Sequence, residues 1–226
     1  MREVVIDTET TGLSHKLGDR IVEVGCVELI NHVATNKTLQ FYCRVEKEMS
    51  KDAQKISGIS NKFLSDKKTF EENHESFLKF IKNDTLIIHN AEFDVGFLNN
   101  ELFIIGMPHL KNPIIDTVSL ARQVLKTRIA NLDYLCRRFN IDLSDRKLHG
   151  ALLDSKLLAE VYLELRGGKQ IAMDLKQDTK ELSADRKIMK TTKNEVKKHT
   201  PTDEELRLHK ETLKNIKQPL WDKYNY

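Results

Sequence analysis

The sequence predicts an α/β fold, a mixed five-stranded sheet flanked by helices, with a flexible C-terminal tail. Apolar, strand-like segments dominate the first 45 residues, and helical patterns dominate residues 48–166. A chain of 226 residues can form one well-packed domain with an appendage. With 39% hydrophobic and 31% charged residues, its composition is that of a soluble globular protein.

Five segments have the composition of β-strands, rich in Val, Ile, Leu and aromatic residues. They lie at residues 4–9, 21–30, 37–45, 86–89 and 114–116. Short connections join the first three, which predicts an antiparallel meander. Helical sequence separates the last two, so we expect those strands to extend the sheet in parallel.

Turn and capping residues mark the ends of the expected elements. In the turn after the first strand, we expect Gly12 to adopt an unusual backbone conformation. Thr69 and Asp116 can cap the helices that follow them, and Gly167-Gly168 would end the last helix of the domain. The expected helices cover residues 48–82, with breaks at Ser57-Gly58 and Ser60-Asn61, then a stretch ending at Phe103, then 117–125, 131–139 and 150–166.

The sequence changes character after Gly168. Residues 174–200 are rich in Lys, Asp, Glu and Thr and poor in large apolar residues, which predicts a flexible linker. Helical patterning returns at residues 202–217, beginning at a Thr202 cap. The predicted organisation is therefore a folded domain at 1–168, a linker at 169–201 and a C-terminal segment at 202–226.

Positive charge is concentrated in the tail. Residues 169–226 carry 14 Lys/Arg and 10 Asp/Glu, whereas residues 1–168 carry 23 and 24. A nearly neutral body cannot bind nucleic acid through net charge, so it would need local positive charge, which bound metal ions could supply.

Nothing in the sequence indicates a membrane or secretory protein. No apolar stretch approaches the length of a membrane span, and the N-terminus lacks the features of a secretory signal. The three cysteines, Cys26, Cys43 and Cys136, show neither metal-ligand nor disulfide spacing. We expect reduced, packed thiols in a cytoplasmic protein.

Two carboxylates, Asp7 and Glu9, lie two residues apart at the end of the first strand. Because side chains alternate along a strand, both point to the same side of the sheet. Two acids held close together repel, and one tends to be protonated unless a cation lies between them. Mg²⁺ uses carboxylate oxygens in this way, although a solvated strand face would also explain the pair.

Two further acids fall on the apolar stripes of their helices. Asp94 shares its stripe with Phe97 and Leu98, and Asp154 shares its own with Leu158. A carboxylate on a buried face must be paired, protonated or bound to metal. A salt bridge would explain either acid alone, but together with Asp7 and Glu9 they indicate a site for two cations.

His149 precedes Asp154 by little more than one helical turn. A lone histidine is usually an ordinary surface or core residue. Beside a metal cluster, however, a neutral imidazole could take a proton from water and promote attack on phosphorus.

Three ordered segments, Asp7–Leu13, His89–Asp94 and His149–Asp154, resemble the three exonuclease motifs of the DEDD family. The His-x4-Asp spacing is typical of the histidine-bearing branch. Within that branch the chain is most similar to the proofreading epsilon subunits of bacterial DNA polymerase III, over roughly residues 3–168.

This resemblance implies a ribonuclease-H-like fold and 3′→5′ hydrolysis of mispaired, single-stranded DNA ends, with release of nucleoside monophosphates. It implies that Asp7, Glu9, Asp94 and Asp154 hold two divalent cations, Mg²⁺ or Mn²⁺, with Asp7 bridging both ions. His149 would be the general base.

The resemblance also implies contacts to the terminal nucleotide. They involve the acids Asp7, Glu9 and Asp154 and the residues Thr8, Thr10, Gly12, Leu13, His89, Asn90 and Phe93. The family places a further acid and a histidine in the segment matching Asp52–Ile59. Here the acid is Asp52, but Ser57 stands in place of the histidine and can donate a hydrogen bond without carrying charge.

The tail resembles partner-binding segments of the same family. Gln170, Met173 and Leu175 resemble a peptide that binds the sliding clamp, although an ordinary linker would read the same way. The segment 202–226 would bind the polymerase catalytic (alpha) subunit. Leu220 and Trp221 form a plausible hydrophobic anchor, with local helix packing as the alternative.

Two other functions stay open from the sequence. One is a related exonuclease acting on RNA or oligonucleotides, against which the long tail argues. The other is a non-catalytic scaffold between polymerase and clamp, against which the intact acids and His149 argue.

Overall fold

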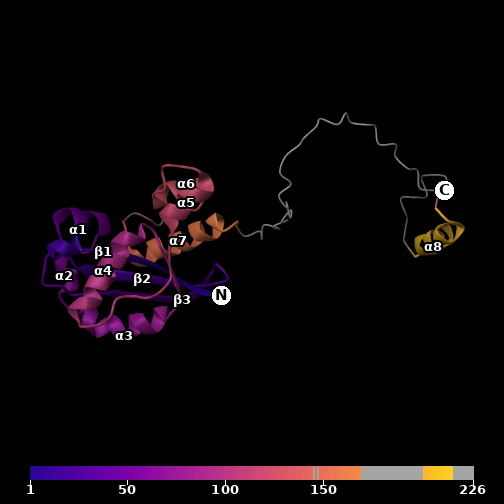
Figure 1. Ribbon diagram of the computed structural model, residues 1–226. Coiled ribbons are helices and arrows are strands. Elements are labelled where there is room, and N and C mark those ends of the chain that lie inside the picture. The colour runs from indigo at the N-terminus through magenta and orange to yellow at the C-terminus, as the bar shows by residue number, and fades with distance from the viewer. Residues whose placement is uncertain (145, 147, 169–200, 216–226) are drawn as a thin grey trace, which may run out of the picture. The chain divides into compact units, whose positions relative to one another are not determined.

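A computed structural model describes residues 1–144, 146, 148–168 and 201–215 of the chain. The chain divides into two compact units, Met1–Leu175 and Lys176–Tyr226. The first contains the sheet and its helices, and the described part of the second contains helix α8 (Asp203–Leu213) (Figure 1). Residues 169–200 of the predicted linker lie outside the described residues. So do Gln170, Met173 and Leu175, which were predicted to bind the clamp, and Leu220 and Trp221, which were predicted to anchor the polymerase.

The first unit is built on a five-stranded sheet with the strand order β3-β2-β1-β4-β5. β1 pairs antiparallel with β2 and β2 with β3, whereas β4 pairs parallel with β1 and β5 pairs parallel with β4. The predicted meander and its parallel extension are confirmed. The strands are β1 (Arg2–Thr10), β2 (Ile21–Ile30), β3 (Val33–Tyr42), β4 (Thr85–Ile88) and β5 (Ile114–Asp116).

The third strand begins four residues earlier than the sequence pattern predicts. Asn31 and His32 have φ angles of 51° and 69° and form a two-residue hairpin turn, which pairs Ile30 with Val33. β3 is an edge strand with largely exposed side chains, so its first half lacks the apolar pattern that would have revealed it.

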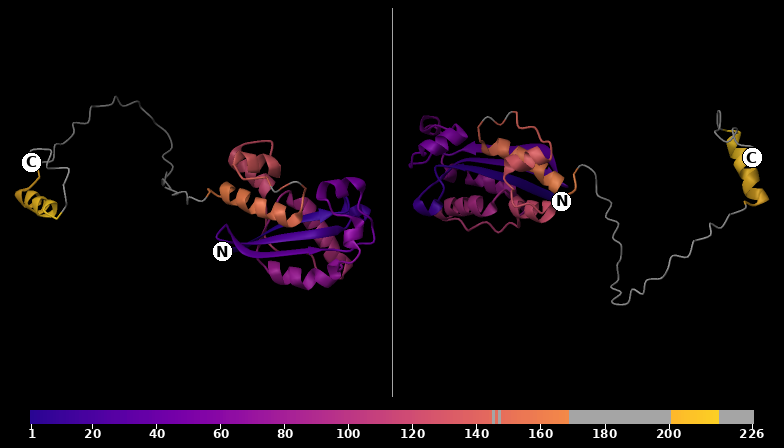
Figure 2. Two further views of the ribbon diagram at one scale, coloured as in Figure 1. Left: turned by 180° about the vertical axis from the view of Figure 1, so that it is seen from behind. Right: turned by 90° about the horizontal axis from the view of Figure 1, so that it is seen from above.

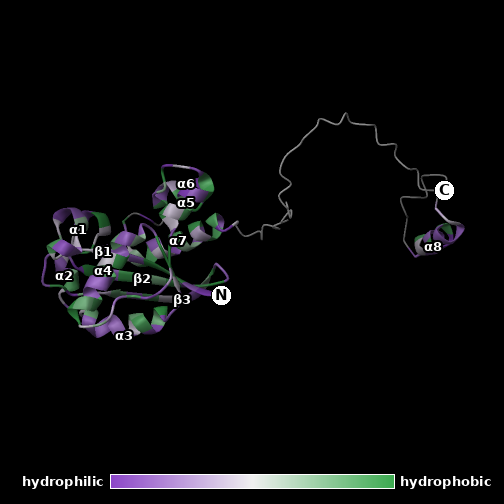
Figure 3. Cartoon of the chain, in the orientation of Figure 1, coloured by the Kyte–Doolittle hydropathy of each residue, from purple (hydrophilic) through white to green (hydrophobic). Residues whose placement is uncertain are grey.

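Helices cover both faces of the sheet (Figures 1 and 2). α3 and α4 pack on one face, and α5, α6 and α7 form the layer on the other. Figure 3 shows hydrophilic and hydrophobic residues on the same helices, as expected when one side of each faces the sheet. The helices of this unit are α1 (Lys51–Ser57), α2 (Asn61–Leu64), α3 (Phe70–Ile81), α4 (Ala91–Ile104), α5 (Thr117–Leu125), α6 (Leu132–Arg138) and α7 (Ala151–Leu165), with a short 3-10 helix at His15–Leu17.

Strand alternation divides the core into two layers and decides where the acids point. Val4 and Ile6 of β1 pack in the layer with α3 and α4, whereas Val5 packs in the layer with α7. Asp7 and Glu9 follow Val5 at intervals of two, so they share the face of β1 that α7 covers.

The predicted caps are present. Thr69 forms a capping box with Glu72, and Thr202 forms one with Glu205. The Asp116 carboxylate accepts a hydrogen bond from the backbone N–H of Val118 at 3.0 Å. These local signals place the helix starts without reference to the rest of the fold.

Glycine is required at position 12 for a different reason from the unusual backbone conformation that we predicted. Its φ angle is not positive; instead, a Cβ at this position would lie 2.5 Å from Oδ2 of Asp19. Asp19 is buried, accepts from the N–H of Ser14 at 3.0 Å and pairs with Lys47 at 2.6 Å. Gly12 is therefore needed because the carboxylate that orders this turn lies directly against it.

No helix among the described residues is long and apolar enough to cross a membrane. Cys26, Cys43 and Cys136 are free and buried, in agreement with the expected packed thiols.

Candidate active site

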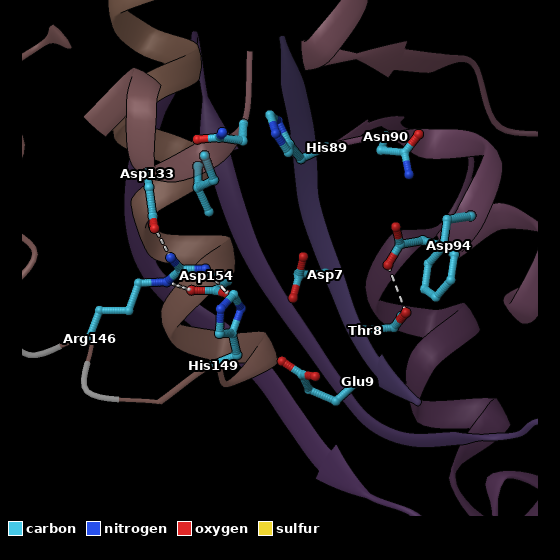
Figure 4. Close-up of a pocket in the computed structure, with 13 residues that line it drawn as sticks. Asp7, Thr8, Glu9, His89, Asn90, Asp94, Asp133, Arg146, His149 and Asp154 are labelled. Atoms are coloured by element: carbon cyan, nitrogen blue, oxygen red, sulfur yellow. Dashed lines mark hydrogen bonds and ion pairs between the residues drawn. The ribbon is translucent and has the colours of Figure 1, made fainter. Parts of the chain in front are cut away.

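A pocket of about 360 Å³ lies at the carboxyl ends of the parallel strands β1 and β4, where α/β folds commonly bind ligands (Figure 4). All five residues predicted to carry the chemistry line it. The lining comprises Asp7, Thr8, Glu9, His89, Asn90, Phe93, Asp94, Asn131, Leu132, Asp133, Arg146, His149 and Asp154.

Three elements deliver the acids to this pocket. Asp7 and Glu9 come from β1, Asp94 from the first turn of α4, and Asp154 from the first turn of α7. Asp7 lies between Asp94 and Asp154 in Figure 4. Asp94 and Asp154 are buried, as their positions on apolar stripes predict.

The acids perturb one another strongly. Burial raises the pKa of Asp7 well above its usual range, and the charges of Asp94, Asp154 and Glu9 raise it further. Burial raises the pKa of Glu9 to about 8, and the charge of Glu23 contributes to this shift. Glu23 is buried on β2, directly opposite Glu9 of β1. The site therefore holds more negative charge than its own positive groups balance.

Asp94 accepts a hydrogen bond that partly offsets the effect of burial on its pKa. The Thr8 hydroxyl donates to its Oδ1 at 2.7 Å and opposes the shift, but burial still raises the pKa of Asp94 to about 7. Among the described residues, no lysine or arginine lies within ion-pair distance of Asp7, Glu9 or Asp94. A salt bridge therefore does not explain why Asp94 is buried.

Asp154 does have such a partner. Arg146 binds it in a bidentate manner, with Nε 2.6 Å from Oδ1 and Nη2 2.8 Å from Oδ2. The ion-pair alternative considered for a buried acid thus applies to Asp154. Burial of both side chains makes this a strong, charge-assisted contact.

His149 stands at the mouth of the pocket, with about half of its side chain exposed. Its backbone N–H donates to the carbonyl of Ile56 at 3.0 Å, which ties the loop before α7 to α1. Possible ligand atoms of Glu9, His149 and Asp154 lie within 4.8 Å of one another, and Asp7 and Asp94 line the same pocket. Such oxygen-rich donors suit a hard divalent cation, and they fit the cations that the resemblance implies.

Comparisons with known proteins show the family of the chain. The model of a family described as "Exonuclease" matches residues 4–162. The chain is 45% identical over 223 residues to the DNA polymerase III subunit epsilon of Rickettsia felis, covering 96% of this chain and 97% of that protein. It is 35% identical over 223 residues to the same subunit of Escherichia coli (strain K12), covering 94% and 92%.

The chain belongs to the DNA polymerase III epsilon family.

Solved structures show that this epsilon-family chain has a ribonuclease-H-like exonuclease fold. The nuclease domain of 3′hExo, a DEDDh family member bound to rAMP, aligns with a TM-score of 0.64 at 20% identity over 73% of this chain and 90% of that chain. Exonuclease X in complex with 5′ overhanging duplex DNA aligns with a TM-score of 0.59 at 23% identity, with the same coverage.

Several predicted substrate residues of this epsilon-family chain lie in the pocket. His89, Asn90 and Phe93 line it beside Thr8. Leu13 is 88% exposed and lies in an adjoining pocket that shares Asn90 and Phe93 with the first. Leu13 is therefore close to the first pocket without lining it.

Four other predicted contacts lie outside the pocket lining. Thr10 is buried and donates to the carbonyl of Gly12 at 2.6 Å, so both act in the turn itself. Asp52 is exposed on α1. Ser57 is buried, and its hydroxyl donates to the Ala53 carbonyl of its own helix at 2.9 Å.

Arg146, Asp133 and Glu23 were not anticipated from the sequence. Glu23 had a readable signal, since it is a charged residue within the largely apolar, buried run of β2. Arg146 and Asp133 had none, because one lies in a polar loop and the other on the first turn of a short helix.

Proposed function

We propose that this chain is the proofreading 3′→5′ exonuclease of a replicative DNA polymerase. It would hydrolyse mispaired 3′ ends of DNA and release nucleoside monophosphates. The observation that carries the proposal is the convergence of Asp7, Glu9, Asp94 and Asp154, with His149, in one pocket of an epsilon-family chain.

Asp7, Glu9, Asp94 and Asp154 would hold two divalent cations, Mg²⁺ or Mn²⁺. When bound, these ions would supply positive charge at the scissile phosphate and increase the acidity of the attacking water. The raised pKa values of Asp7, Glu9 and Asp94 support this role. Burial disfavours the charged form of all three, and at Asp7 and Glu9 the neighbouring acids add repulsion. Bound cations would favour the charged form of each acid.

His149 would act as the general base. Its half-exposed ring lies at the pocket mouth, where it can take a proton from water as the water oxygen attacks phosphorus. The bond between phosphorus and the 3′ oxygen of the preceding nucleotide breaks, and that oxygen leaves with the shortened strand.

Selection of mispaired ends needs no readout of base identity. Asn90 and Phe93 line both adjoining pockets and would contact the terminal nucleotide, with Leu13 beside the strand. A mispaired end melts more readily than a paired one, so a site that accepts only unpaired strands removes it faster.

We further propose that residues 1–168 form the catalytic domain of a cytoplasmic polymerase complex. Gln170, Met173 and Leu175 would bind the sliding clamp within the linker 169–201. The segment 202–226, with Leu220 and Trp221, would bind the catalytic alpha subunit. In support, α8 is capped by Thr202, and none of its residues is buried.

A trimming assay tests the activity. Full-length protein with Mn²⁺ receives a 3′-mispaired DNA primer, the matched primer and an RNA of equivalent sequence. We expect the mispaired DNA to be trimmed fastest and the Asp7→Ala variant to trim nothing. Trimming of RNA alone would support the second class of exonuclease, and absence of trimming would support a scaffold.

A further inference from the structure

One guanidinium binds two groups that the proposed reaction needs. Arg146 binds both oxygens of Asp154, and its Nη2 lies 2.9 Å from Nδ1 of His149 (Figure 4). Its Nη1 donates to Asp133 of α6. The Arg146 side chain is only 9% exposed, so its contacts lie within the pocket rather than on the surface.

The contacts at His149 are mutually exclusive. Nδ1 lies 2.9 Å from Nη2 of Arg146 and 3.2 Å from Oδ2 of Asp154. A guanidinium can only donate, so Nδ1 accepts from Arg146 when it carries no proton. When Nδ1 carries the proton, it can donate to Asp154 instead, and only then does the neutral ring have an unprotonated Nε2.

We propose that Arg146 is a displaceable counter-cation, a positioning residue that holds Asp154 and His149 until a divalent cation takes the Asp154 oxygens. The inference rests on the proposed function for the meaning of the cation site. Both oxygens of Asp154 already accept from Arg146, so a cation that binds them must displace at least one of these hydrogen bonds.

Asp133 can keep its ion pair with the guanidinium of Arg146 after Arg146 leaves Asp154. It already accepts from Nη1, and its side chain is 45% exposed, so it can keep the charge of Arg146 partly in water. Arg146 can therefore leave Asp154 by a change of side-chain conformation while one ionic contact persists. Its departure also frees Nδ1 of His149, so a single displacement exposes a metal ligand and permits the base-competent tautomer.

Binding of Mn²⁺ without DNA tests the competition directly. Free Mn²⁺ is measured by electron paramagnetic resonance during titration of the full-length protein. Because the cation no longer displaces a charge-assisted hydrogen bond, we expect Arg146→Ala to bind Mn²⁺ about tenfold more tightly than wild type. Arg138→Ala, which removes an exposed arginine of α6, is the matched control and should leave the affinity unchanged.

Two further variants keep the test decisive. Arg146→Lys retains the charge but cannot form the bidentate contact, so it should bind Mn²⁺ several-fold more tightly than wild type even if the alanine variant fails to fold. Asp133→Asn should weaken Mn²⁺ binding in the wild-type background and have no effect in the Arg146→Ala background, because the displaced side chain is then absent.

Equal or weaker Mn²⁺ affinity in the folded Arg146 variants would overturn the proposal. The result is independent of the nuclease assignment. If wild type trims no DNA while Arg146→Ala binds Mn²⁺ more tightly, the proposed function fails and the counter-cation stands. If wild type trims DNA and the affinities are equal, the counter-cation fails and the function stands.

Discussion

At the scale of single residues, the acids of the pocket lower the stability of the folded state. Asp7, Glu9 and Asp94 are held together without a lysine or arginine within ion-pair distance among the described residues, and each has a raised pKa. Ionised acids in such a place repel one another and lose hydration. The sequence already indicated this conflict, since two of the four acids lie on apolar stripes.

Replacing Asp7 with asparagine should therefore change activity and stability in opposite directions. We expect Asp7→Asn to lower the trimming rate by at least about 100-fold, because it removes the central carboxylate. In EDTA at pH 8, the same change should raise the free energy of unfolding by about 1 kcal/mol or more. Asparagine does not ionise, so folding no longer has to raise the pKa of a buried carboxyl group at this position.

Urea unfolding and the primer assay measure the two effects. Glu75→Gln, on the exposed side of α3, is the control and should change the free energy of unfolding by less than about 0.5 kcal/mol. A loss of stability in Asp7→Asn would show that the carboxylate is compensated within the fold.

At the scale of elements, the position of α7 decides whether Asp154 reaches the pocket. The first turn of α7 lies against β2 at Gly25, where a Cβ would stand 2.2 Å from the backbone carbon of Ala151. Ser155 strengthens the contact by donating to the Gly25 carbonyl at 2.9 Å. Glycine is needed here for close approach of two backbones, not for its conformational freedom.

Gly25→Ala should force α7 away from the sheet. We expect a loss of about 2–4 kcal/mol in the free energy of unfolding, because neither backbone can yield locally. Trimming should fall as well, since Asp154 and His149 move with the helix. Gly150→Ala is the matched control: nothing lies within 4 Å of its added Cβ and φ is −158°.

The Gly150→Ala protein should unfold within about 0.5 kcal/mol of wild type. Thermal denaturation and urea titration of both variants check the difference. Equal stability of the two alanine variants would contradict the close contact at Gly25.

At the scale of the whole molecule, the acid cluster should dominate the dependence of stability on pH. The pKa of Glu9 is raised to about 8 and that of Asp94 to about 7, whereas the unfolded chain releases these protons near pH 4. Between these values the folded state binds more protons than the unfolded state. The free energy of unfolding must then fall as pH rises.

In EDTA, we therefore expect the midpoint of urea unfolding to decrease from pH 5 to pH 8. Saturating Mn²⁺ should flatten this slope, because the cations replace the protons. Glu28, whose pKa is lowered by its hydrogen bond to Arg2, contributes in the opposite sense and only at lower pH. A midpoint that rises with pH in EDTA would contradict the prediction.

Removal of the tail tests the division into catalytic and partner-binding segments. Residues 1–168 contain every described residue that lines the pocket, so this fragment should trim the mispaired primer at close to the wild-type rate. It should lose binding to the alpha subunit in a pull-down with the purified polymerase. Retained binding would place the partner surface on the catalytic domain.

Much of this protein could be predicted from its sequence because the deciding interactions are local. Alternation in β1 places Asp7 and Glu9 on one face, helical periodicity marks Asp94 and Asp154 as buried, and Thr69 and Asp116 cap their helices as expected. The start of β3 could not be predicted, since an exposed edge strand carries no apolar pattern.

The sequence by itself determined the order of strands and helices, since periodicity and spacing act over a few neighbouring positions. Together with the resemblance to the family, it predicted the five residues of the proposed reaction. Only the tertiary structure decided which side chains pair with one another. Arg146 forms ion pairs with Asp154 and Asp133, and the Ser57 hydroxyl donates to a carbonyl of its own helix instead of facing the pocket. Such pairings depend on distances between elements that are far apart in the chain, and no local pattern encodes those distances.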